Sequence, residues 1–226
     1  MKNIGMIVAV EIDSVLSRYG SPLSRENRSG FAVLTYDLSG VRLHIAHTGA
    51  GEIAAAAATQ LLIDRYEAEL IVNFGVVGGL TGEMAKTKSC IVEKIVHYDF
   101  DISQIDPVRP GQYDGFESEF IPAPAELVER AVRLCPELKR VICASADKFV
   151  GDPAQKARLH ELYGADICEM EAAGIALTCH RSKVPFLMIK TVSDGIEGGA
   201  EEFYAELQRT SAMCLDITDR IIRSGL

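Results

Sequence analysis

Apolar runs alternate with amphipathic stretches along most of the chain. Runs rich in Val, Ile and Phe predict β-strands buried on both faces at residues 4–10, 31–38, 41–49, 70–77, 90–100, 140–146 and 185–193. Between them, the spacing of apolar residues and the helix formers predict helices at residues 51–66, 124–134, 152–164, 171–182 and 201–224. The segment 37–42 is typical of a tight turn that joins two antiparallel strands.

The order of these elements indicates the fold class. Strands that alternate with helices favour an α/β fold, in which a central mixed β-sheet is flanked by helices on both faces. We find no internal repeat, low-complexity tract or linker in the sequence. We therefore expect residues 1–226 to form a single domain.

Composition narrows the classes of partner. The formal net charge is −9 and the sequence contains no Lys/Arg stripe, so we expect no nucleic acid as a partner, because such binding depends on a basic surface. No apolar run reaches the roughly 20 residues that span a bilayer, and the first ten residues fit a β-strand better than a signal peptide, so we expect no membrane association. The six cysteines are scattered without a C-x-x-C pair, which favours a reduced, cytoplasmic location.

Carboxylates are concentrated where predicted strands end. In open α/β sheets, ligands bind at the carboxyl ends of the strands. The five strand-end segments are residues 10–13, 75–80, 147–151, 168–174 and 191–195, and four of them contain an acidic residue. In the segment 168–174, Glu169 and Glu171 are two positions apart and point the same way in an extended chain, whereas at a strand-to-helix junction one can face a site while the other supports it.

Each of these candidates also has a simpler structural explanation. Asp194 can be an ordinary turn or N-cap residue, or a buried carboxyl that keeps its proton, and the sequence alone does not separate the two. Glu11 and Asp13 can simply complement a helix dipole, worth roughly 0.3–1 kcal/mol. Phe149 taken alone fits a core position, and the glycines in the segment 73–80 fit a structural turn. The five histidines lack metal-ligand spacing and no serine lies in a nucleophile elbow, which disfavours a metallohydrolase and a serine hydrolase.

Taken together, the segments resemble a known family. Residues 169–176 and 184–195, read with residues 4–15, 49–63, 70–80 and 146–152 in that order along the chain, are similar to the nucleoside phosphorylase/nucleosidase superfamily. Within it, the sequence is most similar to the methylthioadenosine/S-adenosylhomocysteine nucleosidases, which hydrolyse the N-glycosidic bond of 5′-substituted adenosines. The resemblance implies a three-layer sandwich around a mixed sheet, a homodimer, a small-molecule purine nucleoside as substrate, and neither a metal nor a cofactor.

The resemblance also implies roles for individual residues. Asp194 corresponds to the acid that protonates the leaving adenine, and Ser193 to the residue that orients it. Glu171 corresponds to the residue that binds the ribose hydroxyls and favours the developing positive charge. Met170 is then expected to pack on the sugar and Phe149 to stack on the adenine. By the same resemblance, the backbone of Val150 is expected to contact the edge of the base.

The sequence departs from the family pattern at several positions. Asp13 aligns with the residue that activates water, which is usually Glu, and an offset of the alignment by two positions assigns this role to Glu11 instead. Val76 replaces a common hydroxyl residue and offers only its backbone amide, and Lys190 stands where Arg is common. The loop 98–115 also differs, so the preferred 5′ group stays open.

Three alternative functions remain from the sequence. A purine nucleoside phosphorylase shares the fold, but its phosphate-binding arginines have no counterpart in residues 8–13 or 73–80. A hydrolase of another 5′-modified nucleoside, of the futalosine type, is compatible with the changed loop. A non-catalytic nucleoside-binding protein is the third alternative, and the presence of both Glu171 and Asp194 argues against it.

Overall fold

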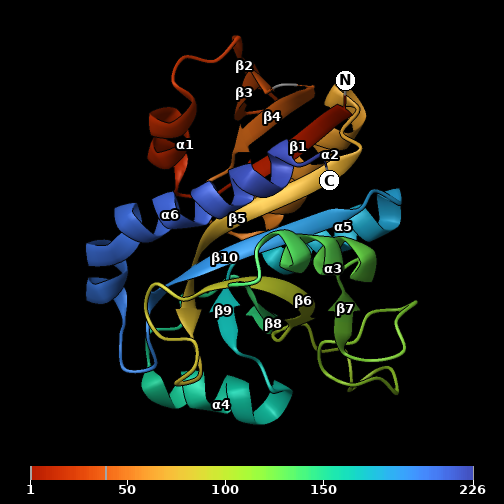
Figure 1. The fold of residues 1–226 in the computed structure, drawn as a ribbon. Helices are drawn as coiled ribbons and strands as arrows, with labels where there is room; N and C mark the ends of the chain where they lie inside the picture. Colours follow the sequence, from red (N-terminus) through yellow and green to blue (C-terminus); the bar gives the residue numbers. More distant parts are fainter. Residues whose placement is uncertain (1, 39, 226) are drawn as a thin grey trace.

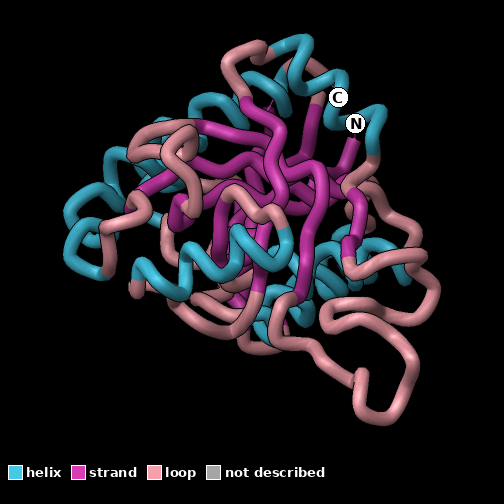
Figure 2. Tube along the Cα trace, turned by 90° about the horizontal axis from the view of Figure 1, so that it is seen from below, coloured by secondary structure: helices cyan, strands magenta, loops and turns pink. Residues whose placement is uncertain are grey.

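The computed structural model describes residues 2–38 and 40–225, with strands in the centre and helices around them (Figure 1, Figure 2). Its strands are β1 Lys2–Val8, β2 Ser24–Arg28, β3 Phe31–Leu38, β4 Val41–His47, β5 Leu70–Gly79, β6 Ser89–His97, β7 Phe120–Pro122, β8 Lys139–Ser145, β9 Ile167–Glu169 and β10 Phe186–Asp194. Its helices are α1 Ile12–Tyr19, α2 Glu52–Tyr66, α3 Ala125–Leu134, α4 Pro153–Tyr163, α5 Ala172–Ser182 and α6 Ala200–Arg223.

The strands form one mixed sheet, in the order β10-β6-β8-β9-β5-β1-β4-β3-β2, with β7 beside β6. β1 pairs in parallel with β4 and β5, whereas β2, β3 and β4 form an antiparallel meander. β10 pairs with β6 and also with β5, so this half of the sheet curls back on itself. The α/β fold class predicted from the sequence is confirmed.

The two strands at the centre of the curled half are completely buried. Every residue of β5 and of β10 is buried, in agreement with their continuous apolar sequence. The parallel register places the C-terminal ends of these strands together, with Asp194 opposite Gly78. This register brings the carboxylate-bearing strand ends to one edge of the sheet.

Helices cover the sheet on both faces. α2 and α5 pack on each other and on β1, β6 and β10, whereas α6 packs on β5, β10 and α1. α4 lies apart from these layers, at the lower end of the view in Figure 1. Leu159 of α4 joins a small apolar cluster with Val150, Cys168 and residues of β6 and β8. Within the described ranges, no helix has both the length and the apolarity needed to cross a membrane.

Most of the predicted elements occur, and the differences concern short ones. The antiparallel pairing of Leu38 with Val41 confirms the turn at residues 37–42, although Ser39 lies outside the described residues. Four elements were not predicted, namely α1, β2, β7 and β9. They have three to eight residues, and hydrophobic periodicity is a weak signal over such lengths.

Candidate active site

A cavity opens where β5, β9 and β10 meet. Gly78 of β5 pairs with Cys168 of β9 on one side and with Asp194 of β10 on the other. The cavity beside this junction has a volume of about 90 Å³. Its lining includes four carboxylate residues from different segments, Glu11, Glu169, Glu171 and Asp194.

Asp194 is the last residue of β10 and only 1% exposed. Its Oδ1 accepts a hydrogen bond from the Ser193 hydroxyl (2.9 Å). Its Oδ2 accepts a hydrogen bond from Lys156 Nζ (2.6 Å). The carboxyl group is therefore held from two sides while its residue still lines the cavity.

Glu171 lies at the N-terminus of α5, and it is buried. Its Oε1 accepts a hydrogen bond from the backbone amide of Gly51 (2.9 Å), which fixes the carboxyl beside the loop that precedes α2. Burial, together with the negative charge of Glu169, raises the pKa of Glu171 to about 8. A proton is thus taken up or released at this carboxyl close to neutral pH.

Glu169 ends β9 and is surrounded by donors. It accepts hydrogen bonds from Ser145 Oγ (2.5 Å), from the amides of Glu171 (3.1 Å) and Ala172 (3.0 Å), and from Lys190 Nζ (3.1 Å). Burial opposes ionisation of this group, but Lys190 and the hydrogen bonds outweigh it and lower its pKa. Glu169 is therefore an ionised anchor that fixes the start of α5.

A serine hydroxyl joins two buried carboxyl groups behind the cavity. Ser145 Oγ lies within hydrogen-bond distance of Glu169 and of Glu52. One hydroxyl has one hydrogen to donate, so the second contact requires a proton on a carboxyl group. Burial and the charge of Glu169 raise the pKa of Glu52 to about 7, which makes Glu52 the carboxyl that carries this proton.

Glu11 and Asp13 lie in different surroundings. Glu11 is 4% exposed, lines the cavity, and accepts hydrogen bonds from the amides of Val76 (2.9 Å) and Val10 (3.0 Å). Asp13 is exposed in the first turn of α1 and is not among the residues that line the cavity. The expectation that Asp13 lies at the site thus disagrees with the geometry. The chain turns into α1 at Ile12, which directs the next acidic residue to the surface.

The other residues proposed from the resemblance surround the same cavity. Val76, Phe149 and Met170 line it. The backbone amide of Val76 donates its hydrogen bond to Glu11, as described above. Phe149 is 43% exposed and packs edge-on against Phe203 of α6, with ring centroids 5.6 Å apart. Val150 is buried and lines a small adjoining space together with Phe149 and Asp194.

Sequence reasoning missed two polar residues of the site. Lys156 is completely buried in α4 and contacts Asp194, and the available signal is its position three residues before Leu159 on the inward face of that helix. Glu52 begins α2, where an acidic residue reads as ordinary complementation of the helix dipole. No sequence pattern distinguished its buried, proton-holding state.

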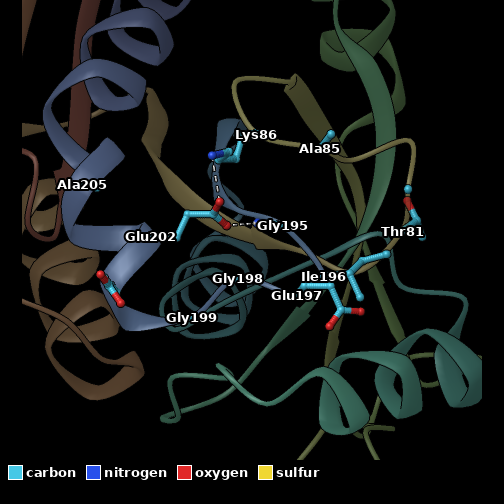
Figure 3. Close-up of a pocket in the computed structure, with 12 residues that line it drawn as sticks. Thr81, Ala85, Lys86, Gly195, Ile196, Glu197, Gly198, Gly199, Glu202 and Ala205 are labelled. Carbon is cyan, nitrogen blue, oxygen red and sulfur yellow. Dashed lines mark hydrogen bonds and ion pairs between the residues drawn. The ribbon is translucent and has the colours of Figure 1, made fainter.

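A larger groove is lined by residues of the loop 195–199, of the segment 81–86 and of α6 (Figure 3). Its volume is about 720 Å³, and Lys86 crosses it to form an ion pair with Glu202 (2.9 Å). Glu202 also accepts a hydrogen bond from the amide of Gly195 (2.9 Å). The groove does not contain the four carboxylates that cluster in the smaller cavity, so we place the candidate active site in the smaller cavity.

Comparison with known proteins agrees with this fold. The family model described as the phosphorylase superfamily matches residues 7–223. The chain belongs to this superfamily. Its fold, with a mixed sheet between helical layers, is the one expected for a member.

Relatives in the superfamily include bacterial nucleosidases. The chain is 30% identical to a 5′-methylthioadenosine/S-adenosylhomocysteine nucleosidase from Shewanella sp. (strain MR-7), covering 84% of this chain and 83% of that protein. It is 31% identical to the protein of the same name from Tolumonas auensis, covering 84% and 85%. Among solved structures, the Neisseria meningitidis nucleosidase in complex with methylthio-immucillin-A is 26% identical, with a TM-score of 0.91 and coverage of 99% and 100%.

A futalosine hydrolase has the same fold. The native structure from Helicobacter pylori strain 26695 superimposes with a TM-score of 0.91, at 22% identity, and covers 99% of this chain and 98% of that one. At this identity the likeness concerns the fold alone.

Proposed function

We propose that the protein is an N-glycosyl hydrolase that cleaves purine nucleosides, with 5′-substituted adenosines such as methylthioadenosine and S-adenosylhomocysteine as substrates. The observation that carries this proposal is the set of buried carboxyl groups around one cavity, of which Glu11, Glu171 and Asp194 each keep unused acceptor positions among the described residues. The names of the related nucleosidases support the choice of substrate.

Asp194 acts as the general acid in this proposal. The purine leaves poorly as an anion, so its departure requires a proton on a ring nitrogen, and a positioned acid contributes typically ~10²–10⁴-fold to the rate. In this proposal the base lies beside Phe149 and Val150, which line a small space next to this carboxyl. Ser193 holds Oδ1 and so fixes the plane of the carboxyl group.

In this proposal Glu171 binds the sugar and Glu11 activates the water. As the bond to the base breaks, the sugar develops positive charge, and a nearby carboxylate stabilises this state. Gly51 holds one oxygen of Glu171 at the cavity, which places the residue to bind ribose hydroxyls and, once it has released its proton, to stabilise the charged sugar. We assign activation of water to Glu11 rather than Asp13, because only Glu11 lines the cavity.

Hydrolysis is favoured over phosphorolysis by the charges around the cavity. The described residues that line it include four carboxylates and no Lys, Arg or His. The two buried lysines that contact these carboxylates, Lys156 and Lys190, are already paired with Asp194 and Glu169. A phosphate dianion placed here would find no cation free to pair with it among the described lining residues, which is costly where water is excluded.

The test is adenine release from methylthioadenosine, measured with and without phosphate. We expect equal release in both, with free methylthioribose as the product. S-adenosylhomocysteine, adenosine, inosine and a futalosine-type nucleoside, assayed in parallel, rank the 5′ preference. Strict dependence on phosphate with a sugar-1-phosphate product would instead establish a phosphorylase. Tight binding without turnover of any nucleoside would establish a binding protein.

Assembly and location are further proposals. We propose a homodimer, supported by the exposure of Ile53 (81%) and Tyr204 (74%), which are large apolar side chains beside segments that line the cavity. The single continuous sheet supports one domain over residues 1–226. A cytoplasmic location stays a prediction from the sequence.

A further inference from the structure

Lys156 is a fully buried cation directly behind the proposed acid. It lies in α4, with none of its surface exposed, and its Nζ contacts Asp194 Oδ2 at 2.6 Å. The same nitrogen donates to the carbonyl oxygens of Gly195 (2.6 Å) and Gly198 (2.9 Å). An ammonium group has three hydrogens, and here three acceptors receive them.

The backbone is shaped to admit this side chain. A Cβ atom built on Gly78 would lie 3.3 Å from Asp194 Oδ2 and 3.7 Å from Lys156 Cε, and only 3.0 Å from Cys168 Sγ. A side chain at this position would therefore crowd the contact between the lysine and the acid. Glycine at the end of β5 leaves room for it.

Burying two charges is unfavourable unless they are paired and hydrogen-bonded. Two apolar residues in these positions would avoid the desolvation of both ions. The stability of the fold therefore does not by itself explain why a charged pair is found here. The lysine also ties the loop 195–198 to α4 through two carbonyl groups. The ion pair thus lies where a reacting carboxyl requires a fixed position and a fixed electrostatic environment.

Other ionisable groups face this pair from neighbouring elements. Cys168 approaches from β9, and burial raises the pKa of its thiol to about 12, so it stays neutral. Glu202 of α6 accepts from the Gly195 amide and is compensated by Lys86, as Figure 3 shows. Lys156 is therefore the cation in direct contact with Asp194 among the described residues.

We infer that Lys156 is a positioning residue for the general acid, an inference that rests on the proposed function. Asp194, the ion-pair partner of Lys156, takes up one proton from solvent before each turnover. When its carboxyl gives this proton to a ring nitrogen of the purine, the bond between the sugar and the base breaks and its electron pair stays with the base. Asp194 is left as a carboxylate next to the Lys156 ammonium, which keeps its three protons. The ammonium stabilises this carboxylate as it forms, without any rearrangement.

Ser193 accommodates both protonation states of the acid. Its Oγ lies 3.2 Å from the carbonyl oxygen of Val77 and 2.9 Å from Asp194 Oδ1, but it has one hydrogen to donate. When it donates to Val77, its oxygen accepts the proton of a neutral Asp194. When it donates to Asp194, it stabilises the carboxylate that remains after transfer.

The test separates acid catalysis from general loss of structure by changing the leaving group. The substrates are methylthioadenosine, whose base leaves only when protonated, and a 4-nitrophenyl 5-methylthioriboside, whose 4-nitrophenolate leaves without a proton. For Lys156→Met we expect kcat for adenine release to fall by about 10²-fold or more. We expect kcat for 4-nitrophenolate release to change by less than about threefold.

A second measurement covers the case in which Lys156→Met folds poorly. In an Asp194→Asn background both charges are removed together, so no buried charge is left unpaired. There, Lys156→Met should change the residual rate by less than about threefold, because residues that act as one unit are not additive. Lys156→Arg, which keeps the charge, should recover part of the lost adenine release.

Three outcomes would overturn the inference. They are equal losses for the two leaving groups in Lys156→Met, adenine release unchanged by this substitution, and a full additive loss in the double variant. Failure of the wild-type protein to release any base would instead refute the proposed function itself. The two failures are thus distinguishable.

Discussion

Two buried lysine–carboxylate pairs each have one residue near the end of β10, Lys190 in one and Asp194 in the other, and the two pairs differ in their surroundings. Lys190 contacts Glu169 at 3.1 Å and Lys156 contacts Asp194 at 2.6 Å, with all four side chains at most 3% exposed. In each pair the attraction offsets the desolvation of both ions. What differs is the number of other donors around the carboxylate.

An ionised carboxylate has about four acceptor positions. The donors around Glu169 fill them, since Ser145, Lys190 and the amides of Glu171 and Ala172 all contact it. Asp194 accepts two hydrogen bonds from the described residues. A saturated carboxylate holds the backbone in place, whereas a half-occupied one retains positions for a substrate. Burial and charge alone do not reveal this difference.

The largest effects on activity and stability should come from replacing the carboxyl group of each pair by the amide of the same size. For Asp194→Asn, kcat for adenine release should fall ~10²–10⁴-fold, because the amide cannot supply the proton. Its thermal stability should also fall, because Lys156 is left as a buried cation without a counter-charge, although the amide oxygen still accepts a hydrogen bond from it. Steady-state assays and thermal melts of the same preparations provide both values.

Glu169→Gln is the matched control for that variant. The amide nitrogen of the new side chain is a donor, and it would face the donors that now contact Glu169. The free energy of unfolding should therefore fall by about 3–5 kcal/mol, the range seen when one partner of a buried pair is removed. The folded fraction should retain more activity than Asp194→Asn. A stable Glu169→Gln with the deeper loss of kcat would reverse the assignment of the two pairs.

The same comparison applies to Glu11, the residue proposed to activate water. It accepts two hydrogen bonds among the described residues, one at each oxygen, and so resembles Asp194 rather than Glu169. Glu11→Gln should lower kcat by about 10²-fold because it cannot take a proton from water. Asp13→Asn, on the exposed face of α1, should change kcat by less than about twofold. The opposite ranking in steady-state assays would restore Asp13 as the base.

The contrast between Glu11 and Asp13 shows where sequence reasoning ends. The buried strands, the sheet edge and the carboxylates Glu171 and Asp194 were predictable, because period and strand-end position depend on local sequence. Which acidic residue of the segment 10–13 faces the cavity depends on where α1 begins. That boundary is the least certain feature of a short helix.

The lysine partners were not predictable for a different reason. Lys156 is 38 positions from Asp194 in sequence, and Lys190 is 21 from Glu169. Their pairing follows from the packing of α4 and from the curled half of the sheet, and the i, i+3 spacing of Lys156 and Leu159 indicates at most an inward-facing lysine, not its partner. A lysine on a helix is ordinarily an exposed residue.

The smallest expected effect concerns Glu171 and the pH dependence of stability. Its pKa is raised to about 8 in the folded protein, so the folded state holds a proton that the unfolded chain loses near pH 4.5. This contribution is fully present below about pH 4.5 and is lost as the pH rises through about 8. Because Glu52 shifts in the same direction, we expect Glu171→Gln to remove part of the decline, about 1–3 kcal/mol between pH 5 and 8. Urea unfolding at several pH values measures it, with Asp13→Asn as the exposed control. Parallel curves for Glu171→Gln and the wild type would show that Glu171 is ionised throughout, like its saturated neighbour Glu169.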